Sequence, residues 1–162
     1  MIVSTLKKQS VIRAAMLDIF LLGVICIVPT LSHLFAIPFY QLNPMLFCLL
    51  TGMILVRDRR NAYLLAVLLP VVSMLVCGMP TPMKALCMVP ELLTIVALFS
   101  FLDKRMPSFM AMVAAALAGK IVYYGLKALI IGPVVLVGTN MWIQLLSIAL
   151  FSVLFSLASK RI

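Results

Sequence analysis

The chain has 162 residues, of which 65% are hydrophobic and 10% charged, and its mean hydropathy is +1.27. This composition excludes a soluble globular enzyme or binding module, because it leaves too little polar surface and its apolar runs are long enough to cross a bilayer. The formal net charge of +9 comes from short basic clusters between apolar runs, which favours membrane topology over nucleic-acid binding as its cause.

The apolar runs predict an all-α integral membrane protein, a single domain over residues 1–162 with six transmembrane helices. The helices are expected at about residues 11–29, 44–56, 62–77, 83–102, 108–131 and 140–159. The stretch from Thr30 to Asn43 is expected to form an outer loop. Asn61 is expected to cap the third helix, and Gly132-Pro133 to end the fifth.

The basic residues predict the orientation of these helices. Ten of the thirteen fall at the chain ends or between helices on one side: Lys7, Lys8, Arg13, Arg57, Arg59, Arg60, Lys104, Arg105, Lys160 and Arg161. Cytoplasmic loops carry the excess of Lys and Arg, so both termini are expected in the cytoplasm.

Several charged residues lie inside predicted helices or at their outer ends, among them Glu91, Lys120 and Lys127. Glu91 and Lys120 are expected at similar depth on antiparallel helices, where they form either a structural ion pair or the lining of a ligand site. Lys127 lies two turns beyond Lys120, where it either extends to the interface or contacts a ligand. Inserting a charged side chain at the membrane centre costs at least about 2.5 to 3.5 kcal/mol of free energy. Each of these residues is therefore expected to have a partner or a function.

Other polar residues also allow two interpretations. Asp18 in the first helix pairs with another chain or bonds internally to a Ser or Thr. His33 is a packed loop histidine or a ligand contact, and there is no second histidine to share a metal. The four cysteines lack C-x-x-C spacing and are interpreted as buried hydrophobes. No metal or cofactor is expected.

Small residues recur on the fifth helix at Ala111, Ala115 and Gly119, a spacing that lets helices approach closely in lipid. Packing within this chain explains them better than docking to another protein. No nucleophile elbow, H-E-x-x-H, Walker loop or workable carboxylate pair is present. The chain is therefore not expected to be an enzyme.

A set of short motifs nevertheless runs along nearly the whole chain. In order they are His33, Asn43-Pro44-Met45, Gly52, Gly78-Met79-Pro80-Thr81-Pro82, Met88-x-x-Glu91-Leu92 and Ala118-Gly119-Lys120. In this combination the chain resembles the substrate-binding S components of energy-coupling factor (ECF) transporters. It is most similar to the branch that reads roughly P-M-H, G-x-P-P, M-x-x-E-L and A-G-R at these places.

The resemblance implies a six-helix S-component fold that captures a vitamin or related micronutrient in a bacterial or archaeal cytoplasmic membrane. It further implies delivery through a transmembrane coupling subunit powered by two cytoplasmic ATPases. Taken with the reasoning above, the expected binding residues are His33, Asn43, Met79, Pro80, Met83, Lys84, Glu91, Lys120, Lys127 and Trp142.

The chain departs from the family pattern at three places. Lys120 stands where the family has arginine, and Leu46 where a histidine often follows Pro-Met. The nearest equivalent of the A-x-x-x-A motif that docks on the coupling subunit is Ser10-x-x-x-Ala14, with Asp18 four residues on. Ser10, Ala14 and Asp18 are therefore the expected docking residues.

The lysines favour one ligand class. Lys84, Lys120 and Lys127 outnumber Glu91 in the outer half, so a ligand with a carboxylate or phosphate is expected. The alternative function is a cell-shape scaffold, because a basic six-helix protein of this length also looks like a rod-shape morphogenesis membrane protein of the MreD type. Such a scaffold does not require charges that converge on the outer mouth.

Overall fold

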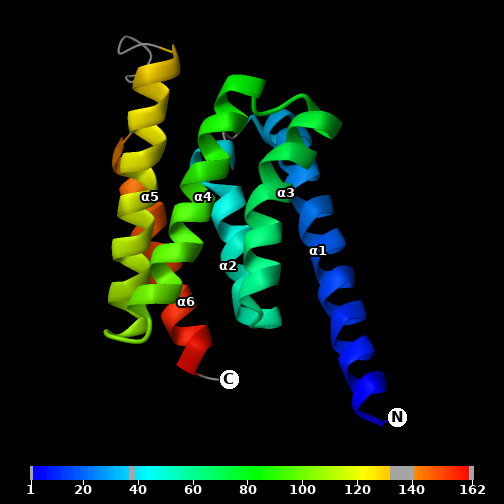
Figure 1. The fold of residues 1–162 in the computed structure, drawn as a ribbon. Coiled ribbons are helices and arrows are strands. Elements are labelled where there is room, and N and C mark those ends of the chain that lie inside the picture. Colours follow the sequence, from blue (N-terminus) through cyan, green and yellow to red (C-terminus); the bar gives the residue numbers. More distant parts are fainter. Residues whose placement is uncertain (1, 37–38, 132–140, 161–162) are drawn as a thin grey trace.

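The computed structural model describes residues 2–36, 39–131 and 141–160, and within these ranges every regular element is helical (Figure 1). The elements are α1 (Ile2–Phe35), the 3-10 helix η1 (Phe39–Leu42), α2 (Pro44–Val56), α3 (Arg59–Cys77), α4 (Pro82–Leu102), α5 (Ser108–Ile131) and α6 (Met141–Lys160). The all-α prediction is confirmed for the described part of the chain. Gly132, Pro133 and Asn140, where a break and a helix start are predicted, lie outside it.

Four of the helices are long and apolar enough to cross a membrane, as expected for a multi-pass membrane protein. The four spans are Val11–Phe35, Arg59–Cys77, Pro82–Leu102 and Ser108–Ile130. The apolar parts of α2 and α6 are shorter, over Pro44–Val56 and Trp142–Ala158. At about 1.5 Å per residue, the 13 residues of α2 extend roughly 20 Å, less than the hydrocarbon thickness of about 30 Å. Six complete crossings therefore stay a prediction.

Successive helices run in alternating directions, so that their ends gather at two levels (Figure 1). The terminal end of the bundle holds the start of α1, the links at 57–58 and 103–107, and the end of α6. The far end holds η1 and the turn between α3 and α4. Helix α1 packs on α2 and α3, α3 on α4, α4 on α5, and α6 on α5 and α2. Both described chain ends lie on one side, and the compartment that they face stays a prediction.

Helix α1 is longer than predicted and continues through Pro29 to Phe35, so the expected outer loop from Thr30 is wrong over its first six residues. Proline removes one backbone donor and weakens the preceding turn, which usually ends a helix. Inside a bundle, neighbouring groups can satisfy the freed carbonyls. The carbonyl that loses its donor is that of Ile25, four residues before Pro29. In the same turn, Cys77 Sγ on α3 donates to the carbonyl oxygen of Cys26 at 3.3 Å, and Ser32 Oγ donates to that of Val28 at 2.9 Å.

Helix α3 begins earlier than predicted, at Arg59, and Asp58 caps it instead of Asn61. The Asp58 carboxylate accepts a hydrogen bond from the backbone N–H of Arg60 at 2.9 Å. A carboxylate is preferred there because it satisfies an unpaired N–H and faces the positive end of the helix dipole. Asn61 is thus free for another contact, described below.

The predicted turn at Gly78 is present and closes α3. Gly78 adopts a left-handed conformation (φ 67°), and its N–H bonds to the carbonyl of Met74 at 3.0 Å. This ending favours glycine because no Cβ opposes the positive φ. The hydroxyl of Ser73 then donates to the carbonyl of Met79 at 2.6 Å, and the Met79–Pro80 peptide is cis. These contacts fix where α4 begins.

The small residues of α5 face α4, as predicted for packing within the chain. Ala111 and Ala115 are fully buried, and a Cβ added to Gly119 would lie 2.6 Å from Ile95 Cγ1 and 3.1 Å from the carbonyl oxygen of Glu91. Because Gly119 has no side chain, the two backbones come together at this level. The neighbouring residue Lys120 is consequently held against α4.

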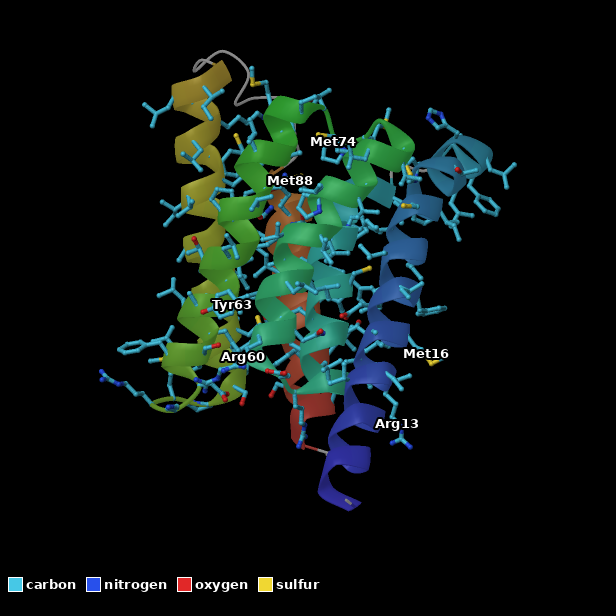
Figure 2. All side chains as sticks on the ribbon, turned by 45° about the vertical axis from the view of Figure 1, so that its right-hand side comes forward. Arg13, Met16, Arg60, Tyr63, Met74 and Met88 are labelled. Carbon is cyan, nitrogen blue, oxygen red and sulfur yellow. The ribbon has the colours of Figure 1, made fainter. Side chains whose placement is uncertain are left out.

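The outer face of α1 is apolar and exposed. Met16, Ile19 and Phe20 are 67%, 70% and 65% exposed, and Figure 2 shows Arg13 and Met16 pointing away from the other helices. An exposed apolar face of this kind suits contact with lipid chains. Arg13 marks the level where that face becomes polar.

Candidate binding site

A buried ion pair joins the two closest helices near the middle of the bundle. Lys120 Nζ on α5 lies 2.7 Å from Glu91 Oε1 on α4, and the two side chains are only 12% and 5% exposed. The predicted juxtaposition of Glu91 and Lys120 is therefore confirmed. The residues around the ion pair determine whether a ligand can share it.

Asn43 is the third member of this charged cluster, which we define as Glu91, Lys120 and Asn43. The residue precedes α2 in a left-handed conformation (φ 55°) and makes no side-chain cap to the helix. Its Oδ1 accepts a hydrogen bond from Lys120 Nζ at 3.4 Å. Its Nδ2 is buried and has no partner among the described residues. A buried amide donor without an acceptor is costly, so this nitrogen is available to a ligand.

An aromatic wall continues the cluster along α5. Lys120 Nζ lies 5.3 Å from the ring centroid of Tyr123, and that ring packs edge-on against Tyr124 at 5.2 Å. The Tyr124 hydroxyl donates to Gln144 Oε1 on α6 at 2.8 Å. Both cation–π attraction and this hydrogen bond hold polar groups inside an apolar bundle. These two tyrosines and Gln144 were not predicted as site residues. The spacing could have identified the tyrosines, because residues three and four positions from Lys120 share its face of the helix.

Lys127 belongs to the same side of α5 and is buried, with 4% of its surface exposed. Its Nζ lies 6.0 Å from the ring centroid of Tyr124. Whether Lys127 extends to the interface or contacts a ligand stays a prediction. A second buried lysine thus lies on the helix that carries Lys120.

Other predicted binding residues lie on the surface. His33 falls in the last turn of α1 instead of a loop, and it is exposed. Four more are exposed at the far end: Met79, Met83, Lys84 and Trp142. Pro80 is half-buried in the turn between α3 and α4. The structure thus brings Lys120 into contact with Asn43 and Glu91, places Lys127 further along α5 next to Tyr124, and leaves the others around the far-end rim.

Asp18 is bound within the chain. Its Oδ1 accepts a hydrogen bond from Asn61 Nδ2 at 3.0 Å, and Asp18 is 6% exposed. An internal bond was one of the two interpretations, and its donor proves to be an asparagine on α3. Ala14 is half-exposed one turn earlier, and Ser10 also lies in α1. Their docking role stays a prediction.

We expect Asn61→Ala to lower the free energy of unfolding by about 1 to 3 kcal/mol, because it leaves the buried Asp18 carboxylate without its donor. Denaturant unfolding in detergent micelles measures the change. Asp18→Asn combined with Asn61→Ala is the control, since removing the charge should recover part of the loss. A single variant as stable as the parent chain would show that this bond does not hold α1 to α3.

Two cavities have no residue of the charged cluster in their lining. An apolar one of about 190 Å³ lies between α1, η1, α2 and α6. A polar one of about 370 Å³ lies at the terminal end, and it has none of the predicted binding residues in its lining. No group of three or more His, Cys, Asp or Glu that could hold a metal occurs among the described residues. Comparisons with protein-family models, curated proteins and solved structures found no match.

Proposed function

We propose that this chain is the membrane-embedded binding subunit of an ECF-type importer, an S component that captures a micronutrient bearing a carboxylate or phosphate. It would pass the ligand to a transmembrane coupling subunit driven by two cytoplasmic ATPases. The chain would lie in a bacterial or archaeal cytoplasmic membrane. The motif resemblance gives this proposal its family, and the charged cluster gives it a site.

The buried cluster of Glu91, Lys120 and Asn43 is the observation that carries the proposal. An ion pair placed in an apolar bundle is weak support for stability, because desolvation offsets most of the attraction and apolar residues often replace such a pair without loss. Buried ionisable residues in membrane proteins therefore point to function. The Nδ2 of Asn43 adds a donor that has no acceptor within the described part of the chain.

The charge balance selects the ligand class. Lys120 and Lys127 are both buried on α5, and among the described residues the carboxylate of Glu91 pairs with Lys120 alone, so an anionic group from a ligand would complete the balance. Such a group can accept from Asn43 Nδ2 and from Lys120 at once, while Tyr123 covers one side. Glu91 orients Lys120 before the ligand arrives.

Native mass spectrometry of the protein, purified in mild detergent from its own or a related host, tests the proposal. We expect a discrete small molecule to remain bound, or one member of a vitamin panel to bind the emptied protein. The bound mass should disappear in Asn43→Leu, in which the unpaired donor is removed and the ion pair is kept. Lys104→Met, at the other end of the bundle, should retain it.

A mass that survives in Asn43→Leu would remove this cluster from the ligand site. A protein that is empty as purified and binds nothing in the panel would contradict the proposal and favour the scaffold of the MreD type.

A further inference from the structure

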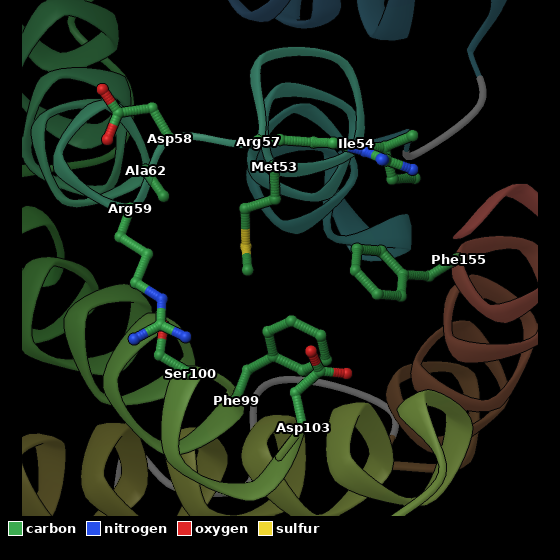
Figure 3. Close-up of a pocket in the computed structure, with 10 residues that line it drawn as sticks. All are labelled: Met53, Ile54, Arg57, Asp58, Arg59, Ala62, Phe99, Ser100, Asp103 and Phe155. Atoms are coloured by element: carbon green, nitrogen blue, oxygen red, sulfur yellow. The ribbon is translucent and has the colours of Figure 1, made fainter. Parts of the chain in front are cut away.

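The polar cavity at the terminal end has no role in the proposed function, and it is a built site of its own. It occupies about 370 Å³, within the size range of small-molecule sites. Four elements meet around it: the end of α2, the start of α3, the end of α4 and α6. Its lining is Met53, Ile54, Arg57, Asp58, Arg59, Ala62, Phe99, Ser100, Asp103 and Phe155 (Figure 3).

Charges of both signs face this cavity without pairing across it. Figure 3 shows Arg59 reaching toward Ser100, Arg57 on the side of Ile54, and Asp103 pointing inward from α4. Among the described residues no ion pair joins either arginine to an acidic group. The cavity therefore keeps the two guanidinium groups and the carboxylate apart.

Local structure fixes where these charges lie. Arg57 ends α2 in a left-handed conformation (φ 55°), and the next residue, Asp58, is committed to capping α3. The Asp58 carboxylate points away from the middle of the cavity in Figure 3. Asp103 is held through one oxygen, because Ser108 Oγ donates to its Oδ1 at 2.9 Å. Its other oxygen remains able to accept a hydrogen bond.

The rest of the lining is apolar and continues toward the bundle core. The rings of Phe99 and Phe155 meet edge-on at 5.0 Å, and Met53 and Ile54 lie opposite them on α2 (Figure 3). Because α2 and α4 end here, this polar rim would lie at the level of the headgroups when the bundle spans a membrane. A ligand that fits must be zwitterionic at one end and apolar at the other.

We propose that this cavity binds a phospholipid whose headgroup is phosphoethanolamine. Arginine guanidinium groups bind phosphate oxygens through paired N–H donors, and Arg57 and Arg59 supply them. The primary ammonium group donates to the free oxygen of Asp103. The start of an acyl chain lies along Phe99 and Phe155. This inference requires only that the protein lie in a membrane, so it stands independently of the transport proposal.

The headgroup chemistry makes the site selective. Phosphatidylglycerol has the phosphate but no cation for Asp103, and that carboxylate repels its anionic charge. Phosphatidylcholine has a cation that is larger and cannot donate a hydrogen bond. Both should bind more weakly than phosphatidylethanolamine with the same acyl chains.

Native mass spectrometry of the detergent-purified full chain, titrated with each of the three lipids, tests the assignment. We expect phosphatidylethanolamine to bind about tenfold more tightly than the other two, as one charge-assisted hydrogen bond implies. The double variant Arg57→Gln/Arg59→Gln should lose about tenfold or more for every lipid. Arg60→Gln, which removes a charge from the same turn outside the cavity lining, should change nothing.

Asp103→Asn gives the sharpest result, because it removes the carboxylate while its side-chain oxygen can still accept from Ser108. Phosphatidylethanolamine should lose its advantage and phosphatidylglycerol should become the preferred lipid. Equal binding of all three lipids to the parent chain, or a preference that Asp103→Asn leaves unchanged, would overturn the proposal. A thermal unfolding midpoint within about 2 °C of the parent identifies folded variants, as expected for surface changes.

Soluble glycerophosphoethanolamine distinguishes a lipid from a free metabolite with the same headgroup. It lacks acyl chains, so we expect at least tenfold weaker binding than that of the lipid. Equal affinity for the two would reject the lipid as the ligand and assign the cavity to the soluble compound.

Discussion

Replacing Lys120 by methionine is expected to cost about 3 to 5 kcal/mol of unfolding free energy, because it leaves the Glu91 carboxylate buried without its partner. Methionine has a similar volume, so the change removes the charge and leaves most of the packing. Glu91 is 5% exposed on α4, and water cannot take over the role of the ammonium group. Denaturant unfolding in detergent micelles measures the loss.

Adding Glu91→Gln to this variant separates stability from binding. We expect the double variant Glu91→Gln/Lys120→Met to recover most of the lost stability, because no unpaired charge remains and the amide is neutral. If the cluster binds ligand, the recovered protein should still hold no bound mass. A double variant that is stable and binds as the parent does would assign the pair a purely structural role.

Lys104→Met is the control for both measurements. Lys104 is exposed in the link between α4 and α5, and surface substitutions of this kind usually change stability by less than about 0.5 kcal/mol. If Lys104→Met were as harmful as Lys120→Met, the effect would reflect net charge and not the buried pair.

Helix positions could be predicted from the sequence wherever a proline, glycine or charged residue marks each end of the helix. Pro44 begins α2 and Arg57 follows it, and the predicted range 44–56 agrees with the structure. The pairing of Glu91 with Lys120 also followed, since two antiparallel helices of similar length place these residues at one depth. Length and register alone were enough for this.

The rotation of each helix about its own axis could not be predicted. For this reason several predicted binding residues lie on the surface of the bundle. In a soluble helix the polar face identifies solvent, whereas in lipid both the packed and the lipid-facing sides are apolar. Met83 and Trp142 therefore carried no signal that they point outward, and they are 54% and 79% exposed. Only small residues such as Gly119 mark the packed side.

Backbone conformation and non-local contacts account for the rest. The contact of Asn43 with Lys120 depends on the left-handed backbone conformation of Asn43. That conformation could not be predicted from the sequence. The continuation of α1 through Pro29 is accompanied by a non-local contact, in which a thiol from α3 bonds the carbonyl of Cys26. Arg57 and Asp103 are 46 positions apart in the sequence, and Arg57 was recognised only as a marker of topology. Their shared cavity appears when four helices meet.

Gly119→Ala is expected to destabilise the protein by about 1 to 3 kcal/mol, the usual cost of overpacking. The new Cβ would lie 2.6 Å from Ile95 Cγ1, 3.0 Å from Ile95 Cδ1 and 3.1 Å from the carbonyl oxygen of Glu91. Because Cγ1 is attached near the backbone, side-chain rotation relieves only part of this contact, and α4 must move away from α5. The movement separates Glu91 from Lys120, so ligand binding should weaken as well.

Gly125→Ala is the matched control on the same helix. A Cβ at Gly125 meets no atom within 4 Å, so the substitution should be neutral or should stabilise the helix by up to about 1 kcal/mol. Combining Gly119→Ala with Ile95→Ala tests the contact itself. The truncated side chain leaves room for the new methyl group, so the double variant should be more stable than the sum of the two single effects predicts. Strict additivity, or equal effects at both glycines, would mean that Gly119 does not set the distance between α4 and α5.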